Sequence, residues 1–264
     1  MLDDPKANRI RGVAKLNKKD ARSETGLFLL EGLQGLKEAL DRPKLIQEIY
    51  ATEVAVEAHL ELFARATSAR IEVNLINDAV LKALTDTQSP QGVVAVCRAL
   101  DVSLSDLLEQ KPNILALLAN VRDPGNAGTV LRAADAAGAD GVIFSDNSVD
   151  VYNPKVVRST TGSLFHLPVV LGATISETIA AAKAAGFQVF AANGGGDSLE
   201  TLSDEVLKKP TLWVFGNEAW GFEAETLELV DRQVGVPIYG AAESLNLATA
   251  ASICLYATAF AQNR

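Results

Sequence analysis

Cysteine, histidine and methionine are scarce in this chain, and their scarcity excludes several kinds of site. The 264 residues include two cysteines, two histidines and one methionine. Cys97 and Cys254 lie far apart in apolar surroundings, which predicts two buried free thiols and no disulfide. Two histidines and two distant cysteines do not have the spacing of a ligand set, so we expect no bound metal.

Long apolar runs and a targeting segment are also missing. No apolar run approaches the ~20 residues of a membrane-spanning helix, and the N-terminus, Met1-Leu2-Asp3-Asp4-Pro5, does not resemble a signal peptide. The composition is 48% hydrophobic and 22% charged, which is enough apolar material for a sizeable core. The sequence therefore predicts a globular, cytoplasmic protein of one or two domains.

Basic residues are also fewer than acidic residues. Lysine and arginine total 24 against 33 acidic residues, which gives a net charge of −9. Taken alone, this balance counts against nucleic-acid binding, because phosphate contacts need lysine and arginine. Residues 1–22 are an exception, with seven basic and three acidic side chains. This segment predicts either a local basic patch or the solvated face of a helix.

The order of apolar and polar segments predicts two α/β domains. Residues 1–105 alternate short strands with helices, and a charged segment around 100–112 reads as the linker. In residues 106–264, short all-apolar strands alternate with helices, which is typical of a parallel sheet covered on both faces. Its expected strands are 113–119, 141–144, 167–171, 187–192, 212–215 and 233–238, and a long helix is expected over 244–262.

One strand-turn-helix unit carries polar side chains that a fold alone does not require. The strand Ile114 to Ala119 leads into a turn at residues 123–126, and an alanine-rich helix follows. Asn126 lies in the turn, and Arg132 lies about two helical turns further on. An amide and a guanidinium on one such unit indicate a site for an anionic ligand.

Two more polar loops directly follow predicted strands. They are residues 216–222 and residues 240–246. Ligands of open α/β sheets bind beyond the carboxyl ends of the strands, so the three loops together favour one site. Taken singly, the loop glycines could be ordinary turn residues, and Ser244 could be the N-cap of the long helix.

Two glycine-rich stretches suggest other ligands. Residues 125–128 resemble part of a dinucleotide-binding fingerprint, but the spacing is wrong and the third glycine is missing. A nicotinamide-dependent oxidoreductase is therefore an alternative function. Residues 194–196 lack the lysine and hydroxyl residue of a phosphate loop, so we expect a flexible loop near the ligand.

The three loops resemble the motifs of the SpoU (TrmH-like) RNA 2′-O-ribose methyltransferases of the SPOUT class. The motifs are Asn120-x-Arg122-Asp123-Pro124-Gly125-Asn126-x-Gly128-Thr129 with Arg132, then Gly216-Asn217-Glu218-x-x-Gly221, and then Pro237-x-x-Gly240 with Ser244-Leu245-Asn246-Leu247-Ala248. The resemblance covers about residues 113–262. The N-terminal part resembles the L30e-like substrate-binding domain common in this family, on Asn8, the basic run through Arg22, Phe28-Leu29-Leu30-Glu31-Gly32 and Pro90-Gln91-Gly92.

The resemblance implies a fold, a reaction and a set of site residues. It implies a SPOUT domain over residues 106–264 with a parallel sheet and a trefoil knot, beside a small L30e-like α/β domain over residues 1–105. It implies transfer of a methyl group from S-adenosylmethionine to a ribose 2′-hydroxyl by a homodimer. The catalytic candidates are Asn126, Arg132, Glu218, Ser244 and Asn246. The cofactor-binding candidates, through main-chain groups, are Ala192, Gly216, Val236, Pro237, Ile238 and Leu245.

RNA, in particular 23S ribosomal RNA, is the implied substrate and partner, because the short transfer-RNA enzymes of the family tend to lack the N-terminal domain. The candidates for RNA contact are Arg9, Arg11, Lys18, Lys19, Arg22 and Arg158, although Arg158 could instead form a structural ion pair. Trp220 could pack at the rim of the site or in the core. A transfer-RNA methyltransferase and a noncatalytic RNA-binding protein of ribosome assembly stay as alternatives.

Overall fold

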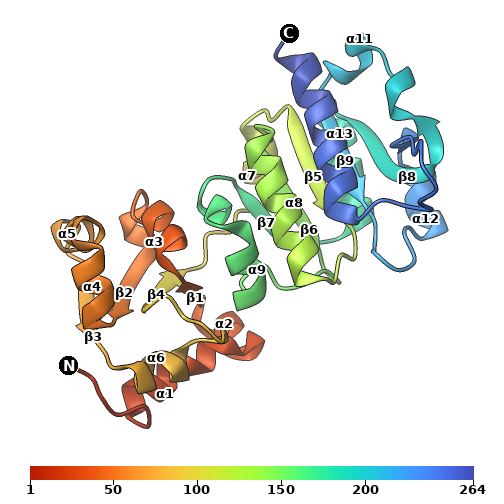
Figure 1. The fold of residues 1–264 in the computed structure, drawn as a ribbon. Helices are drawn as coiled ribbons and strands as arrows, with labels where there is room; N and C mark the ends of the chain where they lie inside the picture. The colour runs from red at the N-terminus through yellow and green to blue at the C-terminus, as the bar shows by residue number, and fades with distance from the viewer. The chain divides into compact units, whose positions relative to one another are not determined.

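The computed structural model describes all residues from 1 to 264 and divides into two compact units. The first unit combines Met1–Leu100 with Tyr152–Phe165, and the second combines Asp101–Val151 with His166–Arg264 (Figure 1). The sequence places residues 152–165 in the second domain, whereas in the structure they pack with the first unit. No helix of the structure is both long and apolar enough to span a membrane.

The first unit is built on a four-stranded mixed sheet in the order β1-β4-β2-β3. Strand β4 pairs antiparallel with both β1 and β2, and β2 pairs parallel with β3. The strands are β1 (Leu27–Glu31), β2 (Ile46–Ala51), β3 (Glu72–Leu75) and β4 (Val93–Arg98). The helices are α1 (Asn8–Ala14), α2 (Lys19–Thr25), α3 (Leu33–Ala39), α4 (Glu53–Ala58), α5 (Leu60–Ser68), α6 (Asp78–Leu84) and α9 (Pro154–Thr160), with 3₁₀ turns at Lys15–Asn17, Pro43–Leu45 and Ser163–Phe165.

The returning segment 152–165 completes an aromatic cluster of the first unit. The ring of Phe28 on β1 stacks on Tyr152 at a centroid distance of 4.7 Å and on Phe165 at 6.3 Å. Phe28 and Phe165 are almost fully buried. Residues far apart in the sequence thus close one core, which apolar periodicity within either segment does not reveal.

The sequence pattern predicts continuous helices over residues 6–19 and 54–66, and the structure interrupts both. His59, with φ −134° and ψ 47°, separates α4 from α5. Lys18 has extended backbone and separates the first helical segment from α2. Thr52 supports the start of α4, because its side chain accepts a hydrogen bond from the Ala55 N–H.

The second unit contains a six-stranded, fully parallel sheet in the order β10-β8-β9-β5-β6-β7. The predicted parallel sheet is confirmed. The strands are β5 (Ile114–Leu118), β6 (Gly141–Ser145), β7 (Val169–Ala173), β8 (Gln188–Ser198), β9 (Thr211–Phe215) and β10 (Arg232–Gly235). The helices are α7 (Leu104–Glu109), α8 (Pro124–Ala136), α10 (Ile175–Ala184), α11 (Asp204–Leu207), α12 (Ala224–Leu229) and α13 (Leu247–Gln262), with a 3₁₀ turn at Leu199–Thr201.

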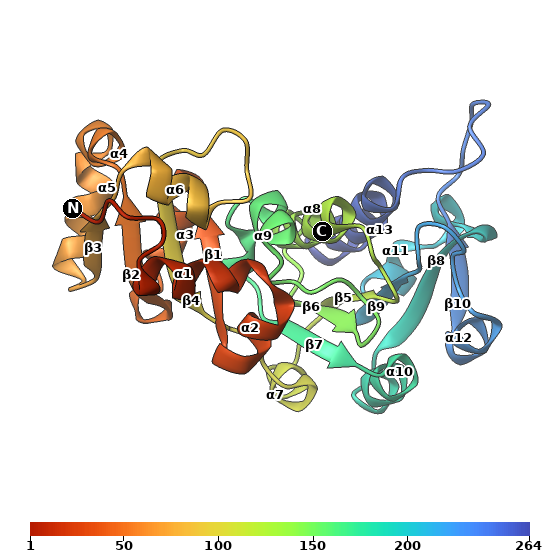
Figure 2. The ribbon, with the colours of Figure 1, turned by 90° about the horizontal axis from the view of Figure 1, so that it is seen from below.

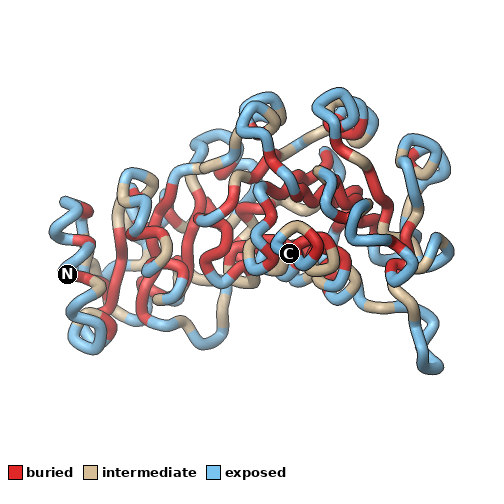
Figure 3. Tube along the Cα trace, turned by 90° about the horizontal axis from the view of Figure 1, so that it is seen from above, coloured by how far each residue is buried: buried red, intermediate tan, exposed pale blue.

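Helices cover both faces of this sheet, which explains its continuous apolar strands. Leu115 and Leu117 of β5 pack in one cluster with Leu107 of α7 and Ile179 of α10. On the other face α8 and α13 lie side by side (Figure 1). There the Trp213 indole N–H donates to Thr258 Oγ1 of α13 at 2.9 Å. Strands β5, β6 and β9 are buried at every position, and Figure 3 shows such buried segments running through the interior of the protein.

The glycines at 194–196 belong to a strand, so the predicted flexible loop is wrong. Strand β8 runs to Ser198 and pairs with β10 on both sides of a register shift (Figure 2). A Cβ on Gly196 would lie 2.2 Å from the Gln233 carbonyl oxygen, whereas one on Gly195 would meet nothing within 4 Å. Gly196 is therefore required where the two backbones approach most closely.

The long C-terminal helix begins three residues later than predicted. Its N-cap is Asn246, whose Oδ1 accepts from the Ala248 and Thr249 N–H groups at 2.9 and 3.4 Å. Ser244 therefore does not cap it, and that alternative is wrong. Both cysteines are buried and free as predicted, and burial raises the pKa of Cys254 to about 12.

Candidate active site

The three polar loops border one cavity of about 630 Å³ in the second unit. This volume lies within the ~300–1,000 Å³ that is usual for cofactor and small-molecule sites. The cavity lies beyond strands β8, β9 and β10 and beside the start of α13. Four predicted catalytic residues and all six predicted cofactor-binding residues line it: Asn126, Glu218, Ser244, Asn246, Ala192, Gly216, Val236, Pro237, Ile238 and Leu245.

The first loop is fixed by its helix cap. Asp123 is the N-cap of α8, and its Oδ1 accepts from the Asn126 N–H at 2.7 Å. Pro124 occupies the first helical position, where its missing N–H has no cost. Asn120 has φ +58°, a left-handed conformation that asparagine tolerates, and its N–H donates to Ser145 Oγ at 2.9 Å.

The second loop is closed by Asn217, which is buried. Its N–H donates to the Gly221 carbonyl at 2.8 Å, and the Gly221 N–H donates back at 2.9 Å. Its side-chain Nδ2 donates to the Asn120 carbonyl at 2.6 Å. A Cβ on Gly216 would lie 2.6 Å from the Gly221 carbonyl oxygen. Asn217 therefore ties the second loop to the first, and Gly216 allows the tight return.

A chain of hydrogen bonds connects all three loops at the cavity. Glu218 accepts from the backbone N–H groups of Arg122 at 3.3 Å and Asp123 at 3.1 Å. The Asn126 amide donates to Glu218 Oε1 at 3.4 Å and accepts from Asn246 Nδ2 at 2.9 Å. Asn246 Oδ1 is already used by α13. Each amide is thus oriented by its partners.

Two conspicuous side chains lie outside this chain of hydrogen bonds. Arg132 on α8 is exposed, does not line the cavity, and has no hydrogen bond or ion pair. Trp220 is 50% exposed, and the Arg122 guanidinium lies over its ring at 5.1 Å. The alternative that Trp220 packs in the core is therefore wrong. Ser244 is exposed at the cavity.

Three glycines at the cavity lie where backbone segments approach one another closely. A Cβ on Gly235 would lie 3.0 Å from the Asn193 carbonyl, and side chains at Gly196 and Gly216 would collide with backbone. Glycines thus keep backbone walls close together around this space.

The basic residues predicted for RNA contact have different surroundings in the first unit. Arg22 is 6% exposed and donates to the Leu16 carbonyl at 2.8 Å. Arg9 is held by Glu48 and Glu72. Arg158 lies 3.1 Å from Glu31 Oε1 and 3.8 Å from Asp86 Oδ2. Arg9, Arg11, Lys18 and Lys19 are exposed, and of these four Arg9 is held in an ion pair.

Three residues that hold the predicted site side chains in place were not themselves among the predicted site residues. Asp123 and Asn217 position the catalytic candidates, and Glu31 pairs with Arg158. Asp123 before Pro124 is a standard start signal for a helix, so its role could have been found. Asn217 gave no sign of its burial, and the partner of Glu31 lies 127 residues away in the chain.

Comparisons with known proteins show the family to which the chain belongs. The family model described as SpoU rRNA Methylase family matches residues 113–256, and the one described as MRM3-like substrate binding domain matches residues 7–95. The chain belongs to the SpoU rRNA methylase family. It is an RNA 2′-O-methyltransferase that uses S-adenosylmethionine, and the predicted family and cofactor are confirmed.

Individual relatives in the family cover the whole chain. The 23S rRNA (guanosine(2553)-2′-O)-methyltransferase RlmP of Bacillus subtilis is 34% identical over 97% of both chains. The 23S rRNA (uridine(2479)-2′-O)-methyltransferase of Streptomyces viridochromogenes is 30% identical over 92% of this chain and 86% of its own. The AdoMet-bound rRNA methyltransferase from Sinorhizobium meliloti superposes with a TM-score of 0.85 at 31% identity, covering 97% of this chain and 96% of the other.

Proposed function

We propose that this protein methylates a ribose 2′-hydroxyl in 23S ribosomal RNA within the cytoplasm. The supporting observation is the hydrogen-bonded chain Glu218–Asn126–Asn246, which borders the same cavity as every predicted cofactor-binding residue. Relatives that cover the whole chain and are named as 23S rRNA methyltransferases support the choice of RNA.

The polar residues act on the ribose, and S-adenosylmethionine supplies an electrophilic methyl group when bound. In-line attack by the 2′-oxygen requires close positioning, because the reacting atoms must meet at the correct distance and angle. Asn126 and Asn246 orient the ribose, and Glu218 holds Asn126 in place. Ser244 contributes a hydroxyl at the rim of the same cavity.

Arg132 clamps the RNA rather than acting as a base. A guanidinium stays protonated at neutral pH, so it does not readily take the hydroxyl proton. It has no protein partner, which leaves its five N–H donors for a phosphate and for stabilising charge that develops on the 2′-oxygen. The proton leaves to a phosphate oxygen or to water.

The N-terminal domain, residues 1–105 by sequence, binds the RNA before the catalytic domain, residues 106–264, modifies it. Arg11, Lys18 and Lys19 are exposed and provide phosphate contacts, whereas Arg22 supports the fold. The net charge of −9 weakens nonspecific RNA binding, since unspecific affinity depends on long-range positive charge. Recognition then depends on local contacts.

The enzyme works as a homodimer, with a second copy covering an exposed apolar stretch near the C-terminus. Tyr239 is 84% exposed, Ile253 39% and Phe260 58%, and all three border one groove. Isolated large apolar groups are common on surfaces, but a contiguous set indicates a contact. The trefoil knot of the SPOUT class stays a prediction for residues 106–264. Light scattering should give twice the monomer mass of 27.9 kDa, and Phe260→Asp should reduce it to one copy.

Two measurements test the function. Isothermal titration calorimetry should show binding of S-adenosylmethionine and none of NAD; absence of S-adenosylmethionine binding would favour the noncatalytic RNA-binding alternative. Mapping of 2′-O-methyl groups in RNA from a deletion strain should show one lost site in 23S rRNA. A lost site in transfer RNA would support the other alternative instead.

A further inference from the structure

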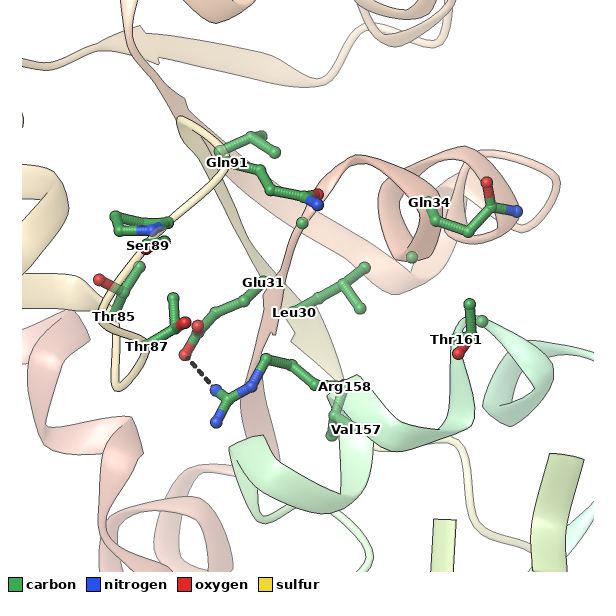
Figure 4. A pocket seen from close by; sticks show the side chains of 15 residues that line it. Leu30, Glu31, Gln34, Thr85, Thr87, Ser89, Gln91, Val157, Arg158 and Thr161 are labelled. Carbon is green, nitrogen blue, oxygen red and sulfur yellow. Dashed lines mark ion pairs between the residues drawn. The ribbon is translucent and has the colours of Figure 1, made fainter. Parts of the chain in front are cut away.

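A second cavity lies wholly within the first unit and takes no part in the site described above. Its volume is about 240 Å³, and it is bounded by the end of β1, the loop before β4, and α9 (Figure 4). Its lining contains both apolar and hydroxyl side chains: Leu30, Val93, Val157, Thr85, Thr87 and Ser89. Such a mixed lining suits a small flat ligand with a polar edge.

The side chain of Glu31 is the first unusual feature of this cavity, because it is only 4% exposed. Its Oε1 accepts from the Asp86 N–H at 3.1 Å, but its buried Oε2 has no hydrogen-bond partner. Burial of the carboxyl group raises its pKa, and the Asp86 N–H and the Arg158 charge offset only part of that effect. A buried acceptor without a donor is rare in folded proteins, so Oε2 is suited to receive one from a ligand.

Arg158 provides the complementary group. Its Nη1 lies 3.1 Å from Glu31 Oε1, yet no N–H of Nη1 is aligned with an acceptor, and the atom is buried. Figure 4 shows the guanidinium reaching from α9 toward Glu31, with Thr87 nearby. The cavity therefore presents an acceptor without a hydrogen-bond partner, Glu31 Oε2, beside the Arg158 guanidinium, which is ion paired with Glu31 Oε1.

We propose that this cavity binds one unstacked nucleobase of the RNA, with Glu31 Oε2 accepting from a base N–H and Arg158 donating to a neighbouring base acceptor. The Watson–Crick edge of every base has a donor beside an acceptor, and splayed bases of single-stranded RNA are read on this edge. The proposal rests on the proposed action on RNA and adds a second contact to the ribose site.

A phosphate group fits this cavity less well than a base does. The positive charge of Arg158 is balanced by Glu31 and Asp86, at 3.1 and 3.8 Å. A phosphate would meet these carboxylates at close range, and like charges in a partly buried site repel strongly. The apolar groups Leu30, Val93 and Val157 also favour an aromatic ring over an anion.

Two backbone amides next to the cavity report on its occupation. The Asp86 N–H is bonded to Glu31, and the Leu33 N–H donates to Gln91 Oε1 at 3.0 Å. We would titrate the whole ¹⁵N-labelled protein with AMP, CMP, GMP, UMP and ribose 5-phosphate. At least one nucleotide should shift both amides in a saturable manner, and ribose 5-phosphate should not. Equal shifts with ribose 5-phosphate, or no shift with any nucleotide, would overturn the proposal.

A matched pair of variants completes the test with RNA. Glu31→Gln keeps the side-chain shape but removes the carboxylate, and Glu53→Gln makes the same change at an exposed position of the first unit outside the cavity. With a mixed-sequence single-stranded RNA, Glu31→Gln should weaken binding about tenfold, because a charge-assisted hydrogen bond is lost, while Glu53→Gln should bind as the wild type does. Equal affinity of both variants would contradict the proposal.

A set of RNAs, each with one abasic site at a different position, distinguishes the loss of a base contact from a folding defect of the variant. Loss of one particular base should weaken wild-type binding and leave Glu31→Gln unaffected. If no position behaves in this way, the cavity does not hold a base. S-adenosylmethionine binding, measured in parallel, tests the proposed function separately, because its cavity shares no residue with this one.

Discussion

Asn246 donates a hydrogen bond of 2.9 Å to Asn126, although the two residues are 120 positions apart in the chain. One amide belongs to the cap of α13 and the other to the first turn of α8. Each side chain therefore fixes the other while both face the cavity, and the pair should behave as one unit in catalysis.

The pair predicts non-additive kinetics. Asn126→Ala and Asn246→Ala should each lower kcat by about 10²-fold, because misplacement of the ribose is costly, and the double variant should lose little more. Single-turnover methylation assays on all four proteins measure the coupling. Calorimetry should show that Asn126→Ala binds S-adenosylmethionine with an affinity within a few-fold of the wild type. If the loss of kcat in the double variant equals the product of the two single losses, the two residues act independently.

Arg132 should be essential for methyl transfer and dispensable for cofactor binding. Arg132→Ala should lower the methylation rate at least about 10²-fold, as expected for loss of a charged group that acts in the transition state. Arg65→Ala, at an exposed ion pair with Asp41, is the control and should retain activity. Full residual activity of Arg132→Ala would refute the assigned role.

Alanine substitutions at two adjacent glycines of β8, Gly195 and Gly196, should have different effects on stability. Gly196→Ala should lower the free energy of unfolding by about 1–3 kcal/mol and weaken S-adenosylmethionine binding, because its Cβ collides with the Gln233 backbone. Gly195→Ala, whose Cβ meets open space, should change neither by much. Urea denaturation and calorimetry check both. Equal effects at the two positions would contradict the close approach of β8 and β10.

The basic N-terminal segment should divide into structural and RNA-binding members. Arg22→Met should destabilise the protein by about 1–3 kcal/mol, because it removes a buried hydrogen bond to Leu16. Lys19→Met should keep stability within about 0.5 kcal/mol but weaken RNA binding and lower its salt dependence. Denaturation curves and RNA titrations at several salt concentrations distinguish the two. Unchanged stability of Arg22→Met would mean that its burial is unimportant.

Glu31 should make the stability of the protein depend on pH. Burial raises its pKa in the folded state above the unfolded value, so the folded protein binds the proton more tightly. Its contribution therefore favours folding at low pH and is lost as the pH rises through the folded-state pKa. The stability of Glu31→Gln relative to the wild type should rise over the pH range above the ordinary glutamate pKa of about 4.3. Urea denaturation across that range checks this, and a constant difference would contradict the raised pKa.

The sequence predicts elements and motif residues better than it predicts their partners. Strand and helix positions follow from local apolar patterns, and the three loops follow strand ends, which a parallel sheet gathers at one edge. The neighbours of β8 in the sheet, the break at His59 and the burial of Arg22 depend on tertiary contacts. Arginine has a long apolar stem, so its charge in the sequence does not reveal whether it is exposed.

The stacking of Phe28 on Tyr152 and Phe165 has a consequence for the evolution and handling of this protein. A fragment that ends near residue 105 would lack both aromatic partners and α9, and would expose the face of β1 that they cover. Proteolytic excision of the N-terminal part should therefore give an insoluble product, and its exchange between relatives at a single crossover point would pack β1 of one protein against residues 152–165 of the other. The N-terminal part of the protein can therefore evolve only together with fourteen residues, 152–165, that lie within the C-terminal part of the sequence.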